Sequence, residues 1–448
     1  YQSAFSALQS AMTPGLLNGI LEFIPYHFYE NWAQKVLFTH ADHDMLNPEK
    51  KLQHYSHRTD SAWQHHYIPL DGTGIGVDSN ETVHVIIVGM SKMGIAMAIE
   101  TAQVAHYPNY VRDNNLRTRI TFIDPEADTE KDFFMGRFRH LFDLSRWRYM
   151  NGSTPIRDAS DRSKGLELTP WNNPSPDYLD IEWEFIKGNV QCHLVQDYLI
   201  HCTTKRRKHT IAICLPNEHE AIAATLFLPR EVLEKAQQIL VYQHSDNAMI
   251  DTVSGANLYS RDLSPNPDGT PKEDTSAYFN KLRYGNIYPF GMCEDSEMHL
   301  SYLRKVGHAA SIIYDSIGDK DFACKDIIGF MTDRCEEGIK HKREEWAKKK
   351  LWEQWSCIYN IATIPTKMRS IAASLHLDHI PNDPFAPLKE HMHGEQNAIK
   401  YGDKGEAMSS VIRRANPNHM PQQEEAILIN MLRLLSEMEH NRWDIEKL

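Results

Sequence analysis

Short apolar runs alternate with helix-forming stretches from Val83 onward, and this alternation is the clearest pattern in the chain. The run from Val83 to Val88 is rich in β-branched residues, which is typical of a strand buried on both faces of a parallel sheet. A helix-forming run from Ile95 to Ala105 follows, and a second strand-like run from Arg119 to Ile123 ends on Asp124. The pattern therefore opens with a strand, a helix and a second strand.

The alternation continues to about residue 290. Further strands are predicted at Ile181–Ile186, Thr210–Leu215, Ile239–Tyr242 and Ile287–Phe290, and helices at Val190–Ile200 and Glu218–Phe227. Strands that alternate with helices at this spacing have right-handed crossovers and lie parallel. The predicted fold class is α/β, a Rossmann-like doubly wound parallel sheet with helical N-terminal and C-terminal extensions.

A helix is also predicted after Asp124. Thr129, followed by Asp132 three residues later, suggests its N-cap. A stripe of apolar residues recurs at helical spacing and is interpreted as core: Phe134, Phe138, Leu141 and Phe142. The segment from Asn151 to Asp177 is rich in Pro, Ser, Asp and Asn and is predicted to be a long insertion loop.

The turn after the first strand has the spacing of a dinucleotide-binding motif, G-x-S-x-x-G. Gly89 allows a tight turn, Gly94 allows helix and strand to approach closely, and the helix N-terminus offers free N–H groups to a phosphate. Ser91 replaces the central glycine and narrows the approach of a pyrophosphate, although its hydroxyl could donate to one. Asp124 comes 30 residues after Gly94, so the crossover carries an insertion, placed at His106 to Leu116. Asp124 could accept the ribose hydroxyls.

Ligands in such sheets bind at the carboxyl ends of the strands. The loops at Gly89, Asp124, Gly188, Pro216 and Gln243 should therefore share one edge of the sheet. This edge is the predicted binding site.

Helices are also predicted before and after the sheet region in the sequence. An amphipathic helix from Ser296 to Ile317 could be core or a dimer seam, and a charged helical stretch from Ile327 to Tyr359 follows. Shorter helices are expected at Ala4–Met12 and Leu16–Phe23, and a last one from Glu424 onward. The predicted division is a helical extension and linker at 1–80, the Rossmann domain at 81–318 and a helical C-terminal region at 319–448.

Composition restricts the classes of function. A net charge of −12 argues against nucleic-acid binding by the whole chain. Seven scattered cysteines without a C-x-x-C pair favour reduced thiols over a disulfide framework or a zinc site. No apolar run approaches the roughly 18 residues of a membrane-spanning helix. Tyr1 is not a start methionine, so we expect a larger protein whose remainder could include membrane helices.

Three polar clusters have alternative interpretations. Histidines between His40 and His66 match no standard metal spacing, so surface histidines are favoured over a metal site. A metal is also disfavoured for the histidines and acids between His376 and Glu395, because nothing fixes these ligands on one rigid element. The basic run from Lys205 to Lys208 is either an anion or lipid-headgroup patch or a solvated turn before a strand. Short charge runs usually face solvent, which favours the turn.

Two parts of the chain resemble known families. From Val83 to about Tyr314 the order of elements resembles the TrkA-N or RCK domain, the Rossmann-like regulatory module of prokaryotic potassium channels and transporters. The matching pieces are the run from Val85 through Gly94, the strand ending in Asp124, Phe185-Ile186-Lys187-Gly188-Asn189, Ile211-Ala212-Ile213-Cys214-Leu215-Pro216-Asn217-Glu218, and the helix from Ser296 in place of the family's dimerising helix. The C-terminal stretch from Leu434 to Lys447 is similar to the opening helix of the RyR repeat, which bacterial proteins couple to a TrkA-N domain.

The resemblance implies a cytoplasmic nucleotide-sensing regulatory module of an ion channel or transporter, without enzymatic activity. The ligand would be NAD or an adenine nucleotide, and the partners a second copy of the chain and a membrane channel or transporter segment. The implied cofactor-binding residues are Gly89, Met90, Ser91, Lys92, Met93, Gly94, Asp124, Asn189, Pro216 and Asn217. The alternatives are an NAD(P)-dependent oxidoreductase, for which no Tyr-x-x-x-Lys pair is found, and a scaffold with an empty Rossmann site.

Overall fold

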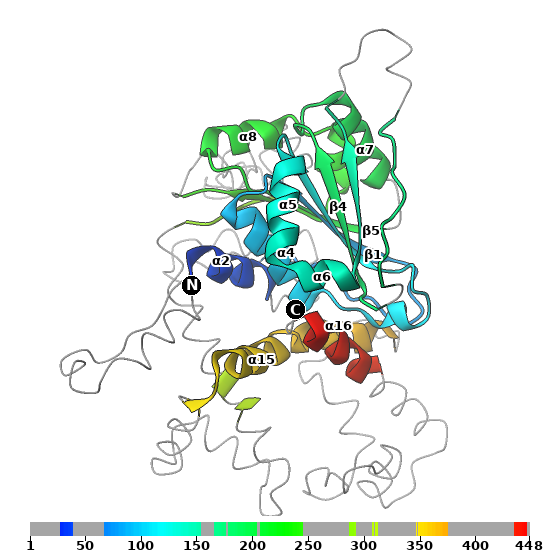
Figure 1. The fold of residues 1–448 in the computed structure, drawn as a ribbon, viewed down its shortest axis with the longest axis vertical. Helices are drawn as coiled ribbons and strands as arrows, with labels where there is room; N and C mark the ends of the chain where they lie inside the picture. The colour runs from blue at the N-terminus through cyan, green and yellow to red at the C-terminus, as the bar shows by residue number, and fades with distance from the viewer. Residues whose placement is uncertain are drawn as a thin grey trace, which may run out of the picture. The chain divides into compact units, whose positions relative to one another are not determined.

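A seven-stranded parallel sheet dominates the computed structural model of this chain (Figure 1). The structure describes residues 27–38, 67–153, 165–175, 178–203, 207–244, 286–292, 307–308, 310–311, 346, 348–374 and 434–445. The strand order is β3-β4-β2-β1-β5-β6-β7, and every neighbouring pair is parallel. The α/β, Rossmann-like fold class predicted from the alternation of strands and helices is therefore confirmed.

The strands are short and, apart from β3, almost entirely buried. Their bounds are β1 Thr82–Val88, β2 Thr118–Asp124, β3 Arg146–Asn151, β4 Ile181–Lys187, β5 Arg207–Ile213, β6 Gln238–Tyr242 and β7 Ile287–Phe290. Strands β2, β3 and β4 lie on one side of β1, and strands β5, β6 and β7 lie on the other. The chain therefore changes direction between β1 and β5, and the carboxyl ends of these two strands mark the topological switch point of the sheet.

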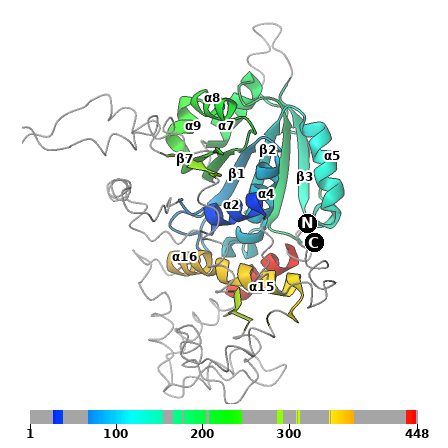
Figure 2. The same cartoon turned by 90° about the vertical axis from the view of Figure 1, so that its left-hand side faces the viewer.

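Helices cover both faces of the sheet (Figure 1 and Figure 2). On one face are α4 (Lys92–Val104), α5 (Ala127–Arg137) and α6 (Arg139–Leu144), and on the other α7 (His193–Thr203), α8 (Glu218–Leu226) and α9 (Arg230–Lys235). The other described helices are α2 (Phe28–Leu37), η2 (Pro108–Val111), α15 (Leu351–Ala362) and α16 (Ile364–Ser374). Residues 434–445 are also helical.

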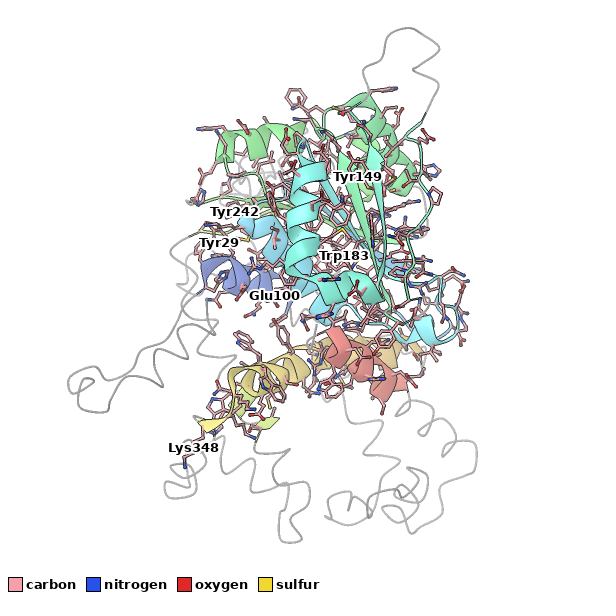
Figure 3. The ribbon with its side chains drawn as sticks, viewed as in Figure 1. Tyr29, Glu100, Tyr149, Trp183, Tyr242 and Lys348 are labelled. Carbon is pink, nitrogen blue, oxygen red and sulfur yellow. The ribbon has the colours of Figure 1, made fainter. Side chains whose placement is uncertain are left out.

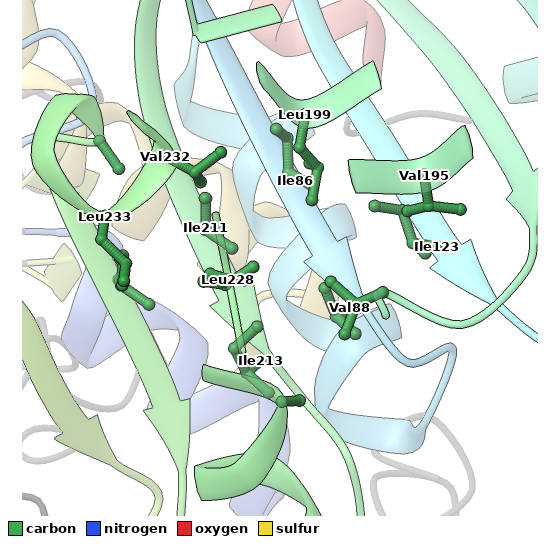
Figure 4. Packing of buried hydrophobic residues seen from close by; sticks show 14 of the residues in the cluster. Ile86, Val88, Ile123, Val195, Leu199, Ile211, Ile213, Leu228, Val232 and Leu233 are labelled. Atoms are coloured by element: carbon green, nitrogen blue, oxygen red, sulfur yellow. The ribbon is translucent and has the colours of Figure 1, made fainter. Parts of the chain in front are cut away.

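The two faces have different cores because successive strand residues point to opposite sides. On the α7 face the core is aliphatic and includes Ile86, Ile123 and Leu199 (Figure 4). On the opposite face it is aromatic: Trp183 lies 5.6 Å from Phe134 of α5 and 5.4 Å from Phe142 of α6, between ring centroids (Figure 3). Both cores remove a large apolar area from water, which is the main favourable term in folding.

Three residues of the predicted apolar stripe after Asp124 are buried, Phe134, Leu141 and Phe142, and Phe138 is half-buried, but the helix differs from the prediction in two ways. The N-cap predicted at Thr129 is wrong, because α5 begins at Ala127 with Glu126 as its N-cap residue. The helix also breaks at Phe138, which ends α5 and precedes α6. The Asp124 carboxylate explains the early start, because its Oδ1 accepts the N–H of Glu126 at 2.8 Å.

Two further predictions were incomplete. Strand β3 and the helices α2, α9 and α16 were not predicted. The interpretation of the basic run as a solvated turn is wrong for Arg207 and Lys208, which belong to β5 and are half-buried; Lys205 and Arg206 lie outside the described residues.

The chain divides into two compact units. The sheet unit combines 32–296, 365–380 and 437–448, and the other unit combines 1–31, 297–364 and 381–436. The helices predicted at Ala4–Met12 and Leu16–Phe23, and nearly all of the one at Ser296–Ile317, lie outside the described residues. Among the described helices, none is both long and apolar enough to span a bilayer.

Candidate functional site

The carboxyl ends of the strands bring the glycine turn together with its neighbours. Gly89 N–H donates to the Ile123 carbonyl at 2.9 Å, and Cys214 N–H donates to the Val88 carbonyl at 2.8 Å. Gly188 N–H donates to the Asp124 carbonyl at 3.0 Å. The loops after β1, β2, β4 and β5 therefore lie next to one another at a single edge, which we call the carboxyl edge.

The two glycines of the turn meet different requirements. Gly89 has φ of 99°, a backbone conformation that other residues adopt only with strain. A Cβ at Gly94 would overlap the carbonyl oxygen of Gly89 and lie 3.2 Å from Cγ2 of Ile87. Gly89 therefore allows the turn, and Gly94 allows α4 to start directly against β1.

Ser91, which replaces the central glycine, is the N-cap of α4. Its Oγ accepts the N–H of Gly94 at 3.2 Å and donates to the Cys214 carbonyl at 2.6 Å. The hydroxyl proton that could serve a phosphate is thus directed at β5. The N–H groups of Lys92 and Met93, the first two of the helix, have no acceptor within an α-helix; they and the helix dipole are the groups that favour an anion here.

Asp124 stands at the end of β2, as predicted, and both of its carboxylate oxygens hold the backbone. Oδ2 accepts the N–H of Met90 at 2.7 Å and Oδ1 accepts that of Glu126 at 2.8 Å. Asp124 therefore fixes the shape of the glycine turn. A carboxylate has about four lone-pair sites, so this half-buried side chain retains capacity for ribose hydroxyls.

The other predicted residues also support local structure. Asn189 Oδ1 accepts the N–H of Gln191 at 2.9 Å. Asn217 caps α8, because its Oδ1 accepts from His219 N–H at 2.9 Å and Glu220 N–H at 3.2 Å. Pro216 is exposed just before this cap. Asn189 and Asn217 lie on the β4 and β5 sides of the glycine turn, so the edge is polar along its length.

Charges of both signs lie at the carboxyl edge. Lys92 is exposed at the first position of α4. Lys187 Nζ lies 2.6 Å from Asp128 Oδ2, and this hydrogen bond raises the pKa of Lys187 and lowers that of Asp128. Lys92, next to the free helix N–H groups, is therefore the cation best placed for a phosphate.

A second polar cluster lies at the opposite, amino ends of the strands and was missed in the sequence. Arg119, Arg148 and Glu184 are buried together on the α7 face. Charged residues alternate with apolar ones in the runs Arg146-Trp147-Arg148-Tyr149 and Glu182-Trp183-Glu184-Phe185. Opposite charges at period two in two strands were the available signal, since buried charges require partners.

Metal ligands and reactive thiols are two further kinds of candidate group. Among the described residues, no group of three or more His, Cys, Asp or Glu side chains could hold a metal ion. Four cysteines in this part are free thiols: Cys192, Cys202, Cys214 and Cys357. The histidine clusters at His40–His66 and His376–Glu395 lie outside the described residues.

Comparisons with protein families, with curated proteins and with solved structures gave no match for this chain. The parallel sheet with a glycine turn at its switch point is Rossmann-like.

Proposed function

We propose that this chain is a nucleotide-sensing regulatory module of an ion channel or transporter, with NAD or an adenine nucleotide as ligand. The observation that carries the ligand-binding part is the position of the glycine turn. Gly89 to Gly94 connects β1 to α4 at the switch point of a parallel sheet, which is where such folds bind ligands.

In this proposal the nucleotide phosphates bind the N–H groups of Lys92 and Met93 and the ammonium group of Lys92. The ribose hydroxyls donate to Asp124, which keeps acceptor capacity beside Met90. Asn189 and Asn217 flank the ligand, one on either side. Each of these contacts uses a group at the carboxyl edge.

The regulatory part rests on the resemblance to the TrkA-N and RCK domains and to the RyR repeat. A module of this kind passes its ligand state to a channel or transporter in the same or a partner chain, and works as a homodimer or higher oligomer on the cytoplasmic side. Coupling requires only that the ligand bind one arrangement more tightly; a tenfold preference corresponds to about 1.4 kcal/mol.

A second candidate is a scaffold whose Rossmann site is empty. It is favoured by the engagement of Ser91 Oγ with Cys214 and of both Asp124 oxygens with backbone N–H groups, because the turn is held without a ligand. An NAD(P)-dependent oxidoreductase is the third possibility, and hydride transfer to any substrate would distinguish it from the first.

Thermal unfolding with and without millimolar NAD, NADH, ATP, ADP and cyclic dinucleotides tests nucleotide binding. A ligand at 100 times its dissociation constant adds about 2.7 kcal/mol, a shift of a few degrees. The informative variant is Lys92→Glu, which reverses an exposed charge at the helix N-terminus. Substitution of Gly89 is unsuitable, because a Cβ there would lie 3.0 Å from the Cys214 carbonyl oxygen at φ of +99°.

The matched control is Lys235→Glu, an exposed lysine in the last turn of α9. We expect one nucleotide to stabilise the wild type and Lys235→Glu equally and Lys92→Glu much less. Equal stabilisation of all three would place the nucleotide elsewhere. No stabilisation by any nucleotide would favour the empty scaffold.

A further inference from the structure

The α7 face of the sheet changes character along the strands. Its carboxyl half is the aliphatic core around Ile86 and Ile123, whereas its amino half carries polar and charged side chains. Because residues two apart in a strand share a face, these side chains form one group, which we call the amino-end cluster: His84, Arg119, Thr121, Arg146, Arg148, Glu182, Glu184, Arg207 and His209.

The two carboxylates of this cluster are fully buried and fully engaged. Glu182 accepts from Arg119 Nε at 2.5 Å through Oε1 and from Arg146 Nε at 2.7 Å through Oε2. Glu184 accepts from Arg148 Nε at 2.7 Å through Oε1.

The second oxygen of Glu184 is engaged as well. Its Oε2 accepts from Thr121 Oγ1 at 2.7 Å and from the hydroxyl of Tyr198 on α7. Burial raises the pKa of Glu184. Arg119, Arg148 and these hydrogen bonds together lower that pKa by more than burial raises it, so the net shift is downward. Three arginines are therefore paired with the two carboxylates.

In the part of the chain that the structure describes, Arg207, the fourth arginine, forms no hydrogen bond with a carboxylate. Its Nη1 lies 4.0 Å from Glu182 Oε1 and its side chain is 17% exposed. No described residue forms a hydrogen bond with this Nη1. Burial, and then the positive charge of Arg119, lower the pKa of Arg207, which is the direction expected for a cation without sufficient compensation.

The two histidines of the cluster, His84 and His209, do not change its net charge. His84 Nε2 lies 2.7 Å from Thr121 Oγ1, and because that hydroxyl donates to Glu184, His84 is the donor. Its Nδ1 and the Nε2 of His209 are buried and have no hydrogen-bond partner among the described residues. Burial lowers the pKa of both histidines, that of His209 to about 4, so both are neutral at pH 7.

Trp171 covers part of the cluster without adding charge. Its ring centroid lies 4.4 Å from the guanidinium carbon of Arg148, 4.8 Å from that of Arg146 and 5.3 Å from that of Arg119. Cation–π contacts favour the cations but leave the net charge unchanged. Among the described residues of the cluster, four guanidiniums against two carboxylates give an excess of two positive charges on this part of the face.

We propose that the amino-end cluster binds a phosphate-class oxyanion, with Arg207 Nη1 donating to the anion and the His209 ring beside it. A phosphate monoester carries a charge of about −1.5 to −2 at pH 7, which matches the excess of two. Guanidinium groups are the donors best suited to such oxygens. The anion is either free phosphate or the phosphoryl group of a small metabolite.

This site is separate from the carboxyl edge. Arg207 begins β5 and Ile213 ends it, and a strand rises about 3.3 Å per residue, so the two sites lie at opposite ends of the sheet. A nucleotide at Lys92 and a phosphate at Arg207 would therefore not compete for the same groups.

Titration calorimetry of the full chain with inorganic phosphate, at constant ionic strength set by sodium chloride, tests the proposal. We expect saturable binding by the wild type, and at least tenfold weaker binding by Arg207→Gln. The matched control is Arg230→Gln, which removes an exposed guanidinium in α9 and should bind phosphate like the wild type. Glycerol phosphate in a second titration separates the sources, since tighter binding than inorganic phosphate indicates a metabolite.

The absence of a saturable heat in the wild type would overturn the proposal, as would equal affinity of Arg207→Gln and the wild type. Thermal unfolding of Arg207→Gln in phosphate-free buffer gives a second test. Removing an uncompensated cation should leave its unfolding temperature equal to or above that of the wild type. A lower temperature would mean that Glu182 compensates Arg207, and the charge argument would fail.

Discussion

At the scale of single residues, the two glycines of the glycine turn are required for different physical reasons. Gly89 is required by its backbone conformation, with φ of 99°. Gly94 is required by space, because a Cβ would meet the carbonyl oxygen of Gly89. A backbone atom cannot move aside as a flexible side chain can, so the space requirement is strict.

We predict that Gly94→Ala lowers the free energy of unfolding by about 2 kcal/mol or more, because α4 must shift away from β1. Urea denaturation measures this. The control is Gly136→Ala in α5, where a Cβ would meet nothing within 4 Å; there alanine should stabilise by about 0.5–1 kcal/mol. Equal effects of the two substitutions would contradict the packing argument.

A second residue-scale prediction concerns pH. Burial, Arg207 and Arg119 lower the pKa of His209 to about 4, and the His84 ring lies 5.3 Å away between centroids. Between pH 6.5 and 4 the unfolded chain binds a proton at this histidine that the folded chain does not. Stability should therefore fall as pH falls through this window, by an amount of the order of 3 kcal/mol from His209.

Denaturation of His209→Gln at pH 7.5 and pH 5, in phosphate-free buffer, checks this contribution. The difference in unfolding free energy between the two pH values should be smaller than in the wild type. It should not vanish, because burial also lowers the pKa of His84. An unchanged difference would show that His209 does not carry the effect.

At the scale of secondary-structure elements, apolar strands were predictable and the charged strand was not. Strand β1 is entirely apolar from Val85 to Val88, and buried parallel strands read as such runs. Strand β3 contains Arg146 and Arg148, which taken alone indicate solvent exposure. Their burial depends on Glu182 and Glu184 in the neighbouring strand β4. These partners are 36 residues away in the sequence, so no local pattern predicts the pairing.

The candidate site shows the same limit. The position of Asp124 at the end of β2 follows from the strand pattern, and the structure has it there. Its bonds to Met90 N–H and Glu126 N–H do not follow, because they depend on how the turn and α5 approach each other. Sequence thus predicts which residues reach the carboxyl edge, but not which of their atoms remain available.

Asn217 provides an element-scale prediction. As the N-cap of α8 it accepts two backbone N–H groups, so Asn217→Ala should cost about 1 kcal/mol in unfolding free energy. Asn217→Asp keeps the acceptor and suits the helix dipole, so it should preserve stability. If urea denaturation finds both substitutions neutral, the cap is unimportant and Asn217 is free for a ligand.

At the scale of the whole molecule, the sheet unit is assembled from distant parts of the chain. Asp71 precedes β1, whereas Arg369 lies in α16. Arg369 Nε donates to Asp71 Oδ2 at 2.8 Å and Nη2 to Oδ1 at 2.7 Å, and the side chains are only 4% and 1% exposed. This bidentate pair joins the 365–380 segment to the sheet region.

Breaking a buried pair leaves an uncompensated charge, so Asp71→Asn should lower the free energy of unfolding by about 3–5 kcal/mol. The control is Glu234→Gln, which breaks the exposed pair with Arg230 and should leave the urea midpoint unchanged. A small effect of Asp71→Asn would mean that the 365–380 segment contributes little to the stability of the sheet unit.

We propose that the carboxyl edge binds a nucleotide at the start of α4. Amide hydrogen exchange of the full chain, with and without saturating NAD or ATP, tests this binding because it reports which segments the nucleotide protects. We predict slower exchange confined to peptides that cover 89–95 and the neighbouring loops at 188–191 and 214–217. Protection elsewhere alone, or none with any nucleotide, would contradict the claim.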